Sequence, residues 1–159
     1  AWEAATAPAR EAGVRVVPLR TGLPLSAHGG LLKPMLVQFR LFAGGPMGSG
    51  RQYLPWISMA DWLGAVRLVL ERDDLAGPVN VVGPEPVTSK EFAHALGRVL
   101  RRPAFWPIPA FALRVALGEF GNEAVASQRV LPGMLTAAGY RFQHSTVDAA
   151  LRAALTPAP

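Results

Sequence analysis

A glycine-rich loop followed by an arginine is the stretch of this sequence best suited to hold a ligand. Residues 44–50 read GGPMGSG, and glycine lets the backbone approach a ligand closely or turn at positive φ. Arg51 and Gln52 follow directly, so theirs are the polar side chains best placed to contact a ligand there. A guanidinium binds two phosphate oxygens in a fork. An ordinary surface loop is the plain alternative.

A second ligand position is predicted where a valine-rich strand ends. Residues 14–20 read VRVVPLR and follow a helical pattern closed by Gly13, which is typical of the second half of a βαβ unit. Ligands in open α/β sheets bind outside the carboxyl ends of the strands. Arg20 and Thr21 lie at that end. The arginine either extends into solvent or pairs with an anion.

Several other chemistries do not fit the sequence. The chain has no cysteine, and His28, His94 and His144 are too widely spaced to form a metal-binding motif. No G-x-S-x-G element offers a serine nucleophile. The loop at 44–50 is not a P-loop, because no Lys-Ser/Thr follows it, and it does not open a helix as a dinucleotide fingerprint does. Asp61 stands fourth in a capping box, which predicts a role at a helix start.

Composition narrows the class of protein further. The chain has 159 residues, half of them apolar, which is enough for one globular domain. Its net charge of +5 comes mostly from scattered arginines, so nucleic-acid binding is a minor alternative and an anionic small ligand is favoured. No apolar run reaches the roughly 18 residues of a membrane span, and no signal peptide is visible. We therefore expect a cytoplasmic protein without membrane or nucleic-acid partners.

The positions of glycine, proline and hydrophobic residues predict an α/β chain in two parts. A shift to proline and aromatic residues near 103 divides a first part, 1–102, from a small, mostly helical part, 103–159. In the helix at 59–72 one apolar face is expected to be buried, namely Trp62, Leu63, Val66, Val69 and Leu70. The last helix is expected to be capped by Ser145. The predicted helices are 2–12, 31–42, 59–72, 88–100, 110–118, 122–130, a short helix to 138 and 145–155, and the predicted strands are 14–20, 52–57 and 79–82, with a loop at 21–30.

The order of these motifs resembles one family. The sequence LRTG at 19–22 after a strand, the loop 44–52, the stretch WISMAD at 56–61 and GPVN at 77–80 resemble the C-terminal half of extended short-chain dehydrogenase/reductases. The similarity is to their NAD-dependent epimerase/dehydratase-like, sugar-nucleotide branch. The tail, with QRVLP and AGYRF, resembles the small DUF1731-type domain of that branch.

The resemblance implies a fold, a cofactor and a set of contacts. The fold would be the C-terminal part of a Rossmann-like domain followed by a small helical domain. In the complete protein the cofactor would be NADP or NAD, contacted by Arg20 and Thr21, and a nucleotide-sugar-like substrate would be contacted by Arg51, Gln52 and Trp56. No catalytic residue or metal ligand is assigned. Pro24 and Ser58-Met59 depart from the family pattern on the substrate side.

One family motif does not occur in these 159 residues. The family's catalytic tyrosine and lysine stand four apart, whereas Tyr53 is followed by Ile57 and Tyr140 by His144 at that spacing. The sequence also begins with Ala1 rather than methionine. We therefore expect a substrate- and cofactor-lining half that needs a missing N-terminal half for activity. The alternative is a non-catalytic binding or interaction module. The surface that would meet the missing half could also support a homo-oligomer.

Overall fold

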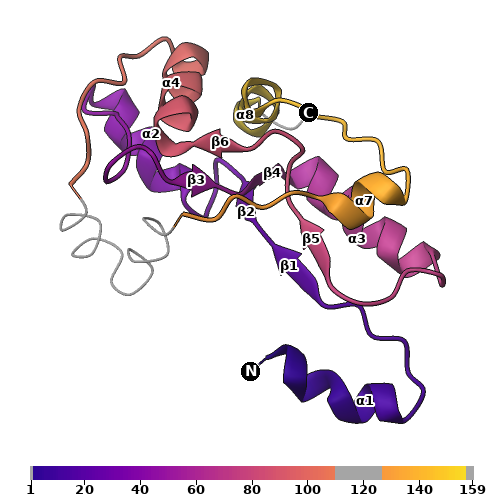
Figure 1. The fold of residues 1–159 in the computed structure, drawn as a ribbon. Helices are drawn as coiled ribbons and strands as arrows, with labels where there is room; N and C mark the ends of the chain where they lie inside the picture. The colour runs from indigo at the N-terminus through magenta and orange to yellow at the C-terminus, as the bar shows by residue number, and fades with distance from the viewer. Residues whose placement is uncertain (1, 110–126, 157–159) are drawn as a thin grey trace.

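The chain folds into short strands covered by helices. The computed structural model describes residues 2–109 and 127–156 (Figure 1). Within them, parallel pairs form between β1 (Leu19–Thr21) and β5 (Val79–Val81), and between β2 (Leu23–Leu25) and β4 (Trp56–Ser58). An antiparallel pair joins β3 (Tyr53–Leu54) to β6 (Val87–Thr88). The predicted α/β class is confirmed.

A single extended run changes its strand partner at Gly22. Before this glycine β1 pairs with β5, and after it β2 pairs with β4. The Gly22 amide donates to the Val81 carbonyl at 3.0 Å, and the next amide, that of Leu23, donates to the Pro55 carbonyl at 2.6 Å. A side chain at Gly22 would overlap the Pro55 carbonyl oxygen. The absence of a β-carbon therefore lets the two strand pairs meet.

The predicted strands were only partly right. Strand β1 covers just the end of 14–20, and β2 lies within the predicted loop 21–30. The predicted strand 52–57 is divided into β3 and β4 around Pro55, because proline has no amide to donate to a ladder. Strand β6 was not predicted. Each error concerns pairing with a distant segment, which local patterns do not report.

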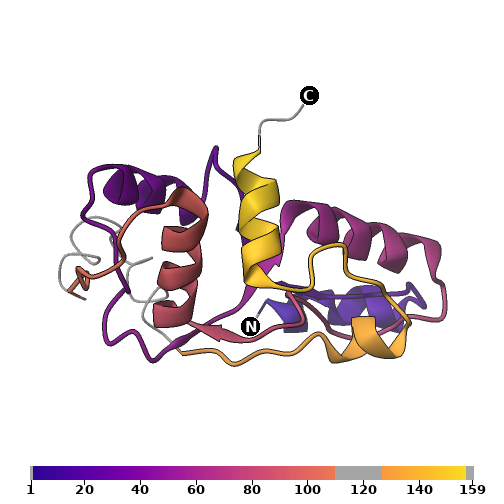
Figure 2. The same cartoon turned by 90° about the horizontal axis from the view of Figure 1, so that it is seen from above.

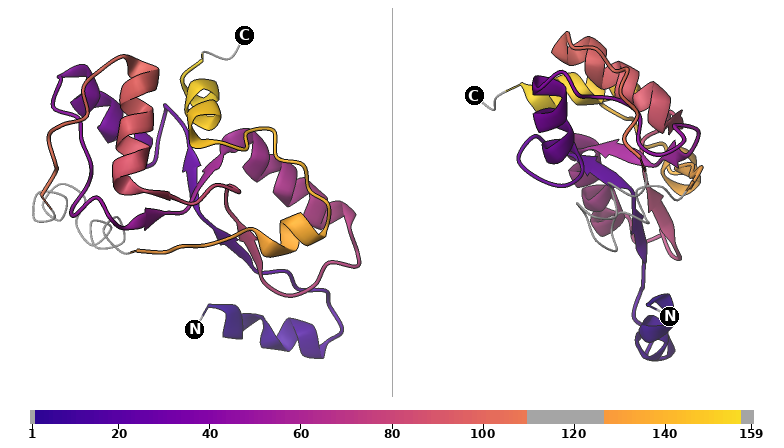
Figure 3. Two further views of the ribbon diagram at one scale, coloured as in Figure 1. Left: turned by 45° about the horizontal axis from the view of Figure 1, so that its top comes forward. Right: turned by 90° about the vertical axis from the view of Figure 1, so that its left-hand side faces the viewer.

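Helices form the rest of the regular secondary structure in the described residues. The N-terminal turn η1 (Glu3–Thr6) and helix α1 (Ala7–Glu11) lie apart from the other elements, below β1 in Figure 3. Ser58 and Thr88 cap the two central helices as predicted, but Thr146, not Ser145, caps the last one by accepting from the Ala149 amide. The other helices are α2 (Leu32–Arg40), α3 (Met59–Glu71), α4 (Ser89–Leu100), α7 (Gly133–Ala137) and α8 (Val147–Leu155).

Two apolar clusters form the core. The first joins β2 and β4 to α2, α4 and α8 around Trp56, Phe39 and Leu96. The second joins β5 to α3 and α7 around Val79, Val81 and Leu135. Figure 2 shows α4, α8 and α3 in a row on one side of the strands. Because α8 packs against α4, this last helix is part of the first core, and the division at 102/103 stays a prediction.

The predicted buried face of α3 was wrong in two places. The helix buries Asp61, Ala65 and Val69, whereas Leu63 is 57% and Leu70 is 70% exposed. The small side chain of Ala65 lets the helix lie close to its neighbours, so the face that turns inward is not the most apolar one. Met59, Leu63, Val66 and Leu70 consequently form a surface stripe along α3.

The predicted helices at 110–118 and 122–130 lie largely outside the described residues. The described end of the second, residues 127–130, is not helical. Here the Gln128 amide donates to the Tyr53 carbonyl at 3.5 Å, so the backbone contacts a distant strand instead of its own preceding turn. Among the helices that the structure describes, none combines the length and apolarity that a bilayer crossing demands.

A buried carboxylate ties the C-terminal segment to the start of α3. Asp61 is 1% exposed, and its two oxygens accept from the backbone amides of Gln143 at 2.7 Å and His144 at 3.0 Å. The Ser58 hydroxyl donates to the same carboxylate at 2.6 Å, and the Tyr140 hydroxyl lies 3.3 Å from it. The helix start and the segment 140–144 are therefore held by one side chain.

The Tyr140 hydroxyl should make stability depend on alkaline pH. Burial, the Asp61 charge and their hydrogen bond raise the pKa of Tyr140 to about 12, whereas an unfolded tyrosine has a pKa of about 10. Above pH 10 the unfolded chain loses this proton while the folded chain keeps it, so stability falls as pH rises through this window. We expect the stability difference between wild type and Tyr140→Phe, from urea unfolding, to be constant below pH 10 and to shrink above it. Parallel curves up to pH 11.5 would contradict this assignment.

Candidate functional site

A cleft near the predicted ligand position lies at the carboxyl ends of β1 and β5. Its volume is about 530 Å³. The floor comes from Arg20, Thr21 and Gly22 on one strand and from Asn80 and Val82 on the next. A segment of the C-terminal part, residues 128–131, forms the opposite wall together with Pro55. The strand-end position thus provides a real concavity, in the size range of small-molecule sites.

Three hydrogen bonds hold the C-terminal wall across the cleft. The Tyr53 amide donates to the Ser127 hydroxyl at 3.2 Å, and the Gln128 amide donates to the Tyr53 carbonyl at 3.5 Å. At the other end, the side-chain amide of Asn80 donates to the Leu131 carbonyl at 3.2 Å. The Arg129 guanidinium lies 5.7 Å from the centre of the Tyr53 ring, within cation–π range. The wall therefore presents Arg129 at a defined place.

The two arginines of the cleft differ in their charge balance. Arg20 forms a bidentate ion pair with Glu3, with N–O distances of 2.7 and 2.9 Å. The hydrogen bond to Arg20 lowers the pKa of the Glu3 carboxyl, so the pair stays ionised at neutral pH. Arg129 has no ion pair within the described residues. An anion entering the cleft would meet Arg129 as the uncompensated cation.

The structure brings only some of the predicted site residues together. Arg20 and Thr21 line the cleft, and the Thr21 hydroxyl accepts from the Trp62 indole at 3.4 Å. Arg51, Gln52 and Trp56 do not line it. Their substrate-binding role stays a prediction.

The three predicted substrate residues have different surroundings. Gln52 is 5% exposed, donates to the Met47 carbonyl at 2.7 Å and accepts from the Ser49 hydroxyl at 3.1 Å. Trp56 is 1% exposed and donates its indole proton to the Glu85 carbonyl at 2.8 Å. Arg51, in contrast, is exposed. Gln52 and Trp56 thus hold the glycine-rich loop and the strand behind it, and only Arg51 is free to reach a ligand.

The glycine-rich loop is fixed to the start of α4. The Met47 amide donates to the Ser89 hydroxyl at 2.9 Å, and the Lys90 amide donates to the Gly50 carbonyl at 2.9 Å. Gly48 and Gly50 have φ values of 54° and 73°, the region that favours glycine. The loop therefore has a defined shape that sets the position of Arg51.

Sequence reasoning missed Asn80, Gln128 and Arg129 as site residues. Asn80 lies near the carboxyl end of β5, which pairs in parallel with the strand that ends at Thr21. The strand-end argument used for Thr21 could therefore have predicted Asn80 as well. No local signal points to Arg129, which lies 76 positions beyond Tyr53 in the sequence. As built, the site offers a cation together with amide and hydroxyl groups.

The fold and the cleft define an α/β chain with a concave site at the carboxyl ends of two parallel strands. The family model described as a domain of unknown function, DUF1731, matches residues 108–154. An epimerase family protein of Mycobacterium bovis is 45% identical over 98% of this chain and 52% of its own length. The mouse epimerase family protein SDR39U1 is 41% identical over 95% of this chain and 52% of its own.

Solved structures agree with these relatives. The crystal structure of human epimerase family protein SDR39U1 with NADPH has a TM-score of 0.82 and 36% identity, over 88% of this chain and 48% of that one. The Thermus thermophilus UDP-glucose 4-epimerase complex with NAD shares the fold, with a TM-score of 0.64 over 94% and 48% of the two chains at 18% identity. The chain is thus related to the epimerase family proteins and corresponds to their C-terminal part. It spans about half the length of the curated relatives it matches.

Proposed function

We propose that this chain forms the substrate- and cofactor-lining half of an NAD(P)-dependent oxidoreductase or epimerase. The observation that carries the proposal is the cleft at the carboxyl ends of two parallel strands, closed by 128–131. Such strand ends are where open α/β sheets bind ligands. The human relative solved with NADPH supports a nicotinamide dinucleotide as the cofactor.

The residues present in the cleft fit part of such a dinucleotide. Thr21, Asn80 and Gln128 supply hydrogen-bonding groups, and Arg129 supplies a positive charge for a phosphate. The missing β-carbon at Gly22 lets Pro55 and Val82 pack against the strand and so shapes this side of the cleft. When bound, the cofactor would supply hydride acceptance or donation. This chain would bind and orient it, while Arg20 keeps η1 attached to β1 through Glu3.

A nucleotide-sugar-like substrate is the proposed second ligand. Arg51 is the proposed contact, because its exposed guanidinium follows a loop that is fixed to α4. Gln52 and Trp56 would act indirectly, by holding this loop and β4 in place. The alternative is a non-catalytic binding module of the same fold. Nucleotide binding without turnover of any nucleotide sugar would support that alternative.

Replacing Arg129 with alanine should weaken nucleotide binding. A hydrogen bond to a charged group contributes about 1.5–3 kcal/mol, which corresponds to a rise in Kd of roughly 10- to 100-fold. The measurement is a fluorescence titration with NADPH, and a parallel calorimetric titration with UDP, on the longest product of the gene. Arg152→Ala, which removes an exposed arginine from α8, is the matched control and should leave both affinities unchanged. Equal affinities for wild type and Arg129→Ala would contradict the proposal that this cleft binds the nucleotide.

A further inference from the structure

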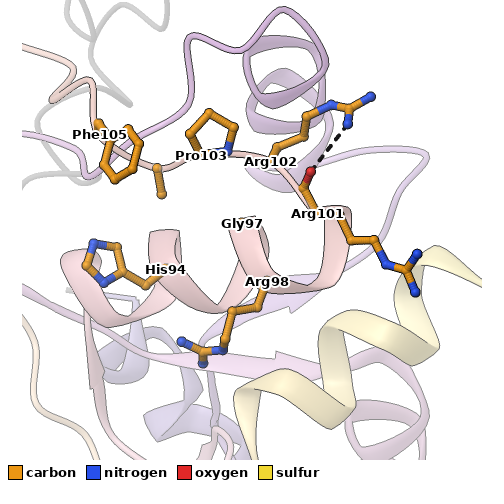
Figure 4. A pocket seen from close by; sticks show the side chains of 8 residues that line it. His94, Gly97, Arg98, Arg101, Arg102, Pro103 and Phe105 are labelled. Carbon is orange, nitrogen blue, oxygen red and sulfur yellow. Dashed lines mark hydrogen bonds between the residues drawn. The ribbon is translucent and has the colours of Figure 1, made fainter.

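A second concavity lies on α4, away from the cleft. Its volume is about 400 Å³, and it shares no lining residue with the cleft at β1 and β5. Helix α4 forms one side and the segment 102–105 forms the other (Figure 4). A β-carbon on Gly97 would lie 2.8 Å from the Arg102 carbonyl oxygen and 3.3 Å from the β-carbon of Ala104. Glycine at this position therefore lets the segment lie directly on the helix.

The interior of this α4 pocket is apolar and open at an aromatic end. Gly97, Pro103 and Ala104 form the floor, and the rings of His94 and Phe105 flank one end (Figure 4). Phe105 is 79% exposed, and the next residue, Trp106, is 66% exposed. His94 has no hydrogen bond within the described residues, and exposed aromatic side chains are typical of protein interfaces. The α4 pocket has room for one large apolar side chain.

Arginines surround the pocket and leave it positively charged. Arg98 is neutralised by Asp148 on α8, with N–O distances of 3.1 and 2.7 Å. The Arg102 guanidinium stacks 4.5 Å from the Phe42 ring centre and donates to the Arg101 carbonyl at 3.3 Å. Arg101 has no ion pair within the part of the chain that the structure describes. Two positive charges thus remain uncompensated at the rim.

The guanidinium groups point in different directions. In Figure 4, Arg98 extends toward the His94 end, Arg102 extends away on the opposite side, and Arg101 points toward α8. They cannot converge on a single phosphate or carboxylate. Several acidic groups spaced along a larger partner would match them, with one apolar anchor between them. The geometry therefore favours a peptide segment over a small anion.

The backbone turns sharply at the end of α4. Arg101 and Phe42, with φ values of 54° and 60°, are the non-glycine residues in the left-handed region within residues 2–109 and 127–156. Arg101 is the C-cap of α4, and its amide donates to the Arg98 and Gly97 carbonyls, so its left-handed backbone is a common way to end a helix. Arg102 follows Arg101 and stacks on Phe42. The left-handed cap at Arg101 therefore turns the chain from α4 into the segment 102–105 that lines the α4 pocket.

From these observations we infer that the α4 pocket docks an acidic segment of a partner protein. An aromatic or large aliphatic side chain enters between His94 and Phe105, and flanking carboxylates pair with Arg101 and Arg102. Aromatic residues and arginine are the types enriched at interface hot spots. This surface is independent of the proposed nucleotide cleft.

Selection from a random dodecapeptide display library on the 159-residue chain tests the inference. We expect enriched peptides with one aromatic or large aliphatic residue among acidic residues. Phe105→Ala and Arg101→Glu should each weaken a labelled consensus peptide at least 10-fold in fluorescence anisotropy, while Arg152→Glu and Leu70→Ala should change its Kd less than 2-fold. Phe105 and Leu70 are both largely exposed, so matching thermal unfolding checks that both variants fold.

Three results would overturn the inference. The first is enrichment without acidic residues, or no enrichment at all. The second is an equal loss with Arg152→Glu, which would indicate non-specific attraction to a basic chain. The third is self-association of the wild-type chain in sedimentation velocity that Phe105→Ala abolishes, because a second copy would then be the occupant. Failure here would leave the NADPH titration of the cleft unaffected.

Discussion

Asp61→Ala should lower the free energy of unfolding by about 3–5 kcal/mol, the loss seen when one partner of a buried charged network is removed. The carboxylate is 1% exposed and accepts from the amides of Gln143 and His144 and from the Ser58 hydroxyl. Each donor left unpaired costs about 1–3 kcal/mol. Urea unfolding followed by circular dichroism measures the change.

The geometry around Asp61 also predicts what a conservative replacement does. Ser58 has one hydroxyl proton, and its 2.6 Å contact assigns that proton to Asp61, so His144 donates from Nδ1 to the Ser58 oxygen at 3.0 Å. Asp61→Asn would turn an amide toward these donors, and we expect it to lose part of the same stability. Asp74→Asn is the control, because its ion pair with Arg72 is largely exposed and such pairs contribute about 0–1 kcal/mol. A loss below 1 kcal/mol for Asp61→Ala would show that the C-terminal segment is held by other contacts.

Gly22→Ala should be the most disruptive single-carbon change in the cleft. The added carbon would overlap the Pro55 carbonyl oxygen and lie 2.9 Å from a Val82 methyl group. Overpacking costs typically about 1–3 kcal/mol, and here the obstacle is backbone, so the upper end is expected. For a chain of this size that is a fall in Tm of roughly 6–12 °C. Differential scanning fluorimetry measures it.

A glycine between β2 and α2 gives the comparison. Gly29 has no atom within 4 Å of the position of a β-carbon, and its backbone is not in the left-handed region. Gly29→Ala should therefore leave Tm unchanged or raise it slightly, since it restricts the unfolded chain. Gly22→Ala should also weaken NADPH binding in the longest gene product, because both strand pairs beneath the cleft move. Similar Tm values for the two variants would mean that the Pro55 backbone shifts at little cost to make room for the added carbon.

Local signals predicted the helices well. The capping boxes at Ser58 and Thr88 placed α3 and α4, because a cap is a short-range hydrogen bond that the sequence states directly. Strand β2 was missed because its partner β4 lies about 30 residues away and its own sequence contains proline. The buried face of α3 was misassigned because its neighbours, not its hydrophobic content, decide which side turns inward.

The candidate site shows the same limit. Strand-end reasoning brought Arg20 and Thr21 to the cleft, since topology fixes where parallel strands end. It could not show that the side-chain amide of Gln52 donates to the Met47 carbonyl inside the loop. Nor could it place Arg129 beside Tyr53, because a contact between segments so far apart depends on the whole fold.

The extended run β1–Gly22–β2 affects how the molecule unfolds. Before Gly22, β1 pairs with β5, which packs in the second apolar cluster, whereas β2, after Gly22, packs in the first cluster. In the C-terminal segment, α7 packs in the second cluster and α8 in the first. The chain thus passes between the two clusters several times, so loss of packing in one cluster disturbs the other. Cooperativity across the whole described chain is the consequence: calorimetric and van't Hoff enthalpies should coincide in a single transition.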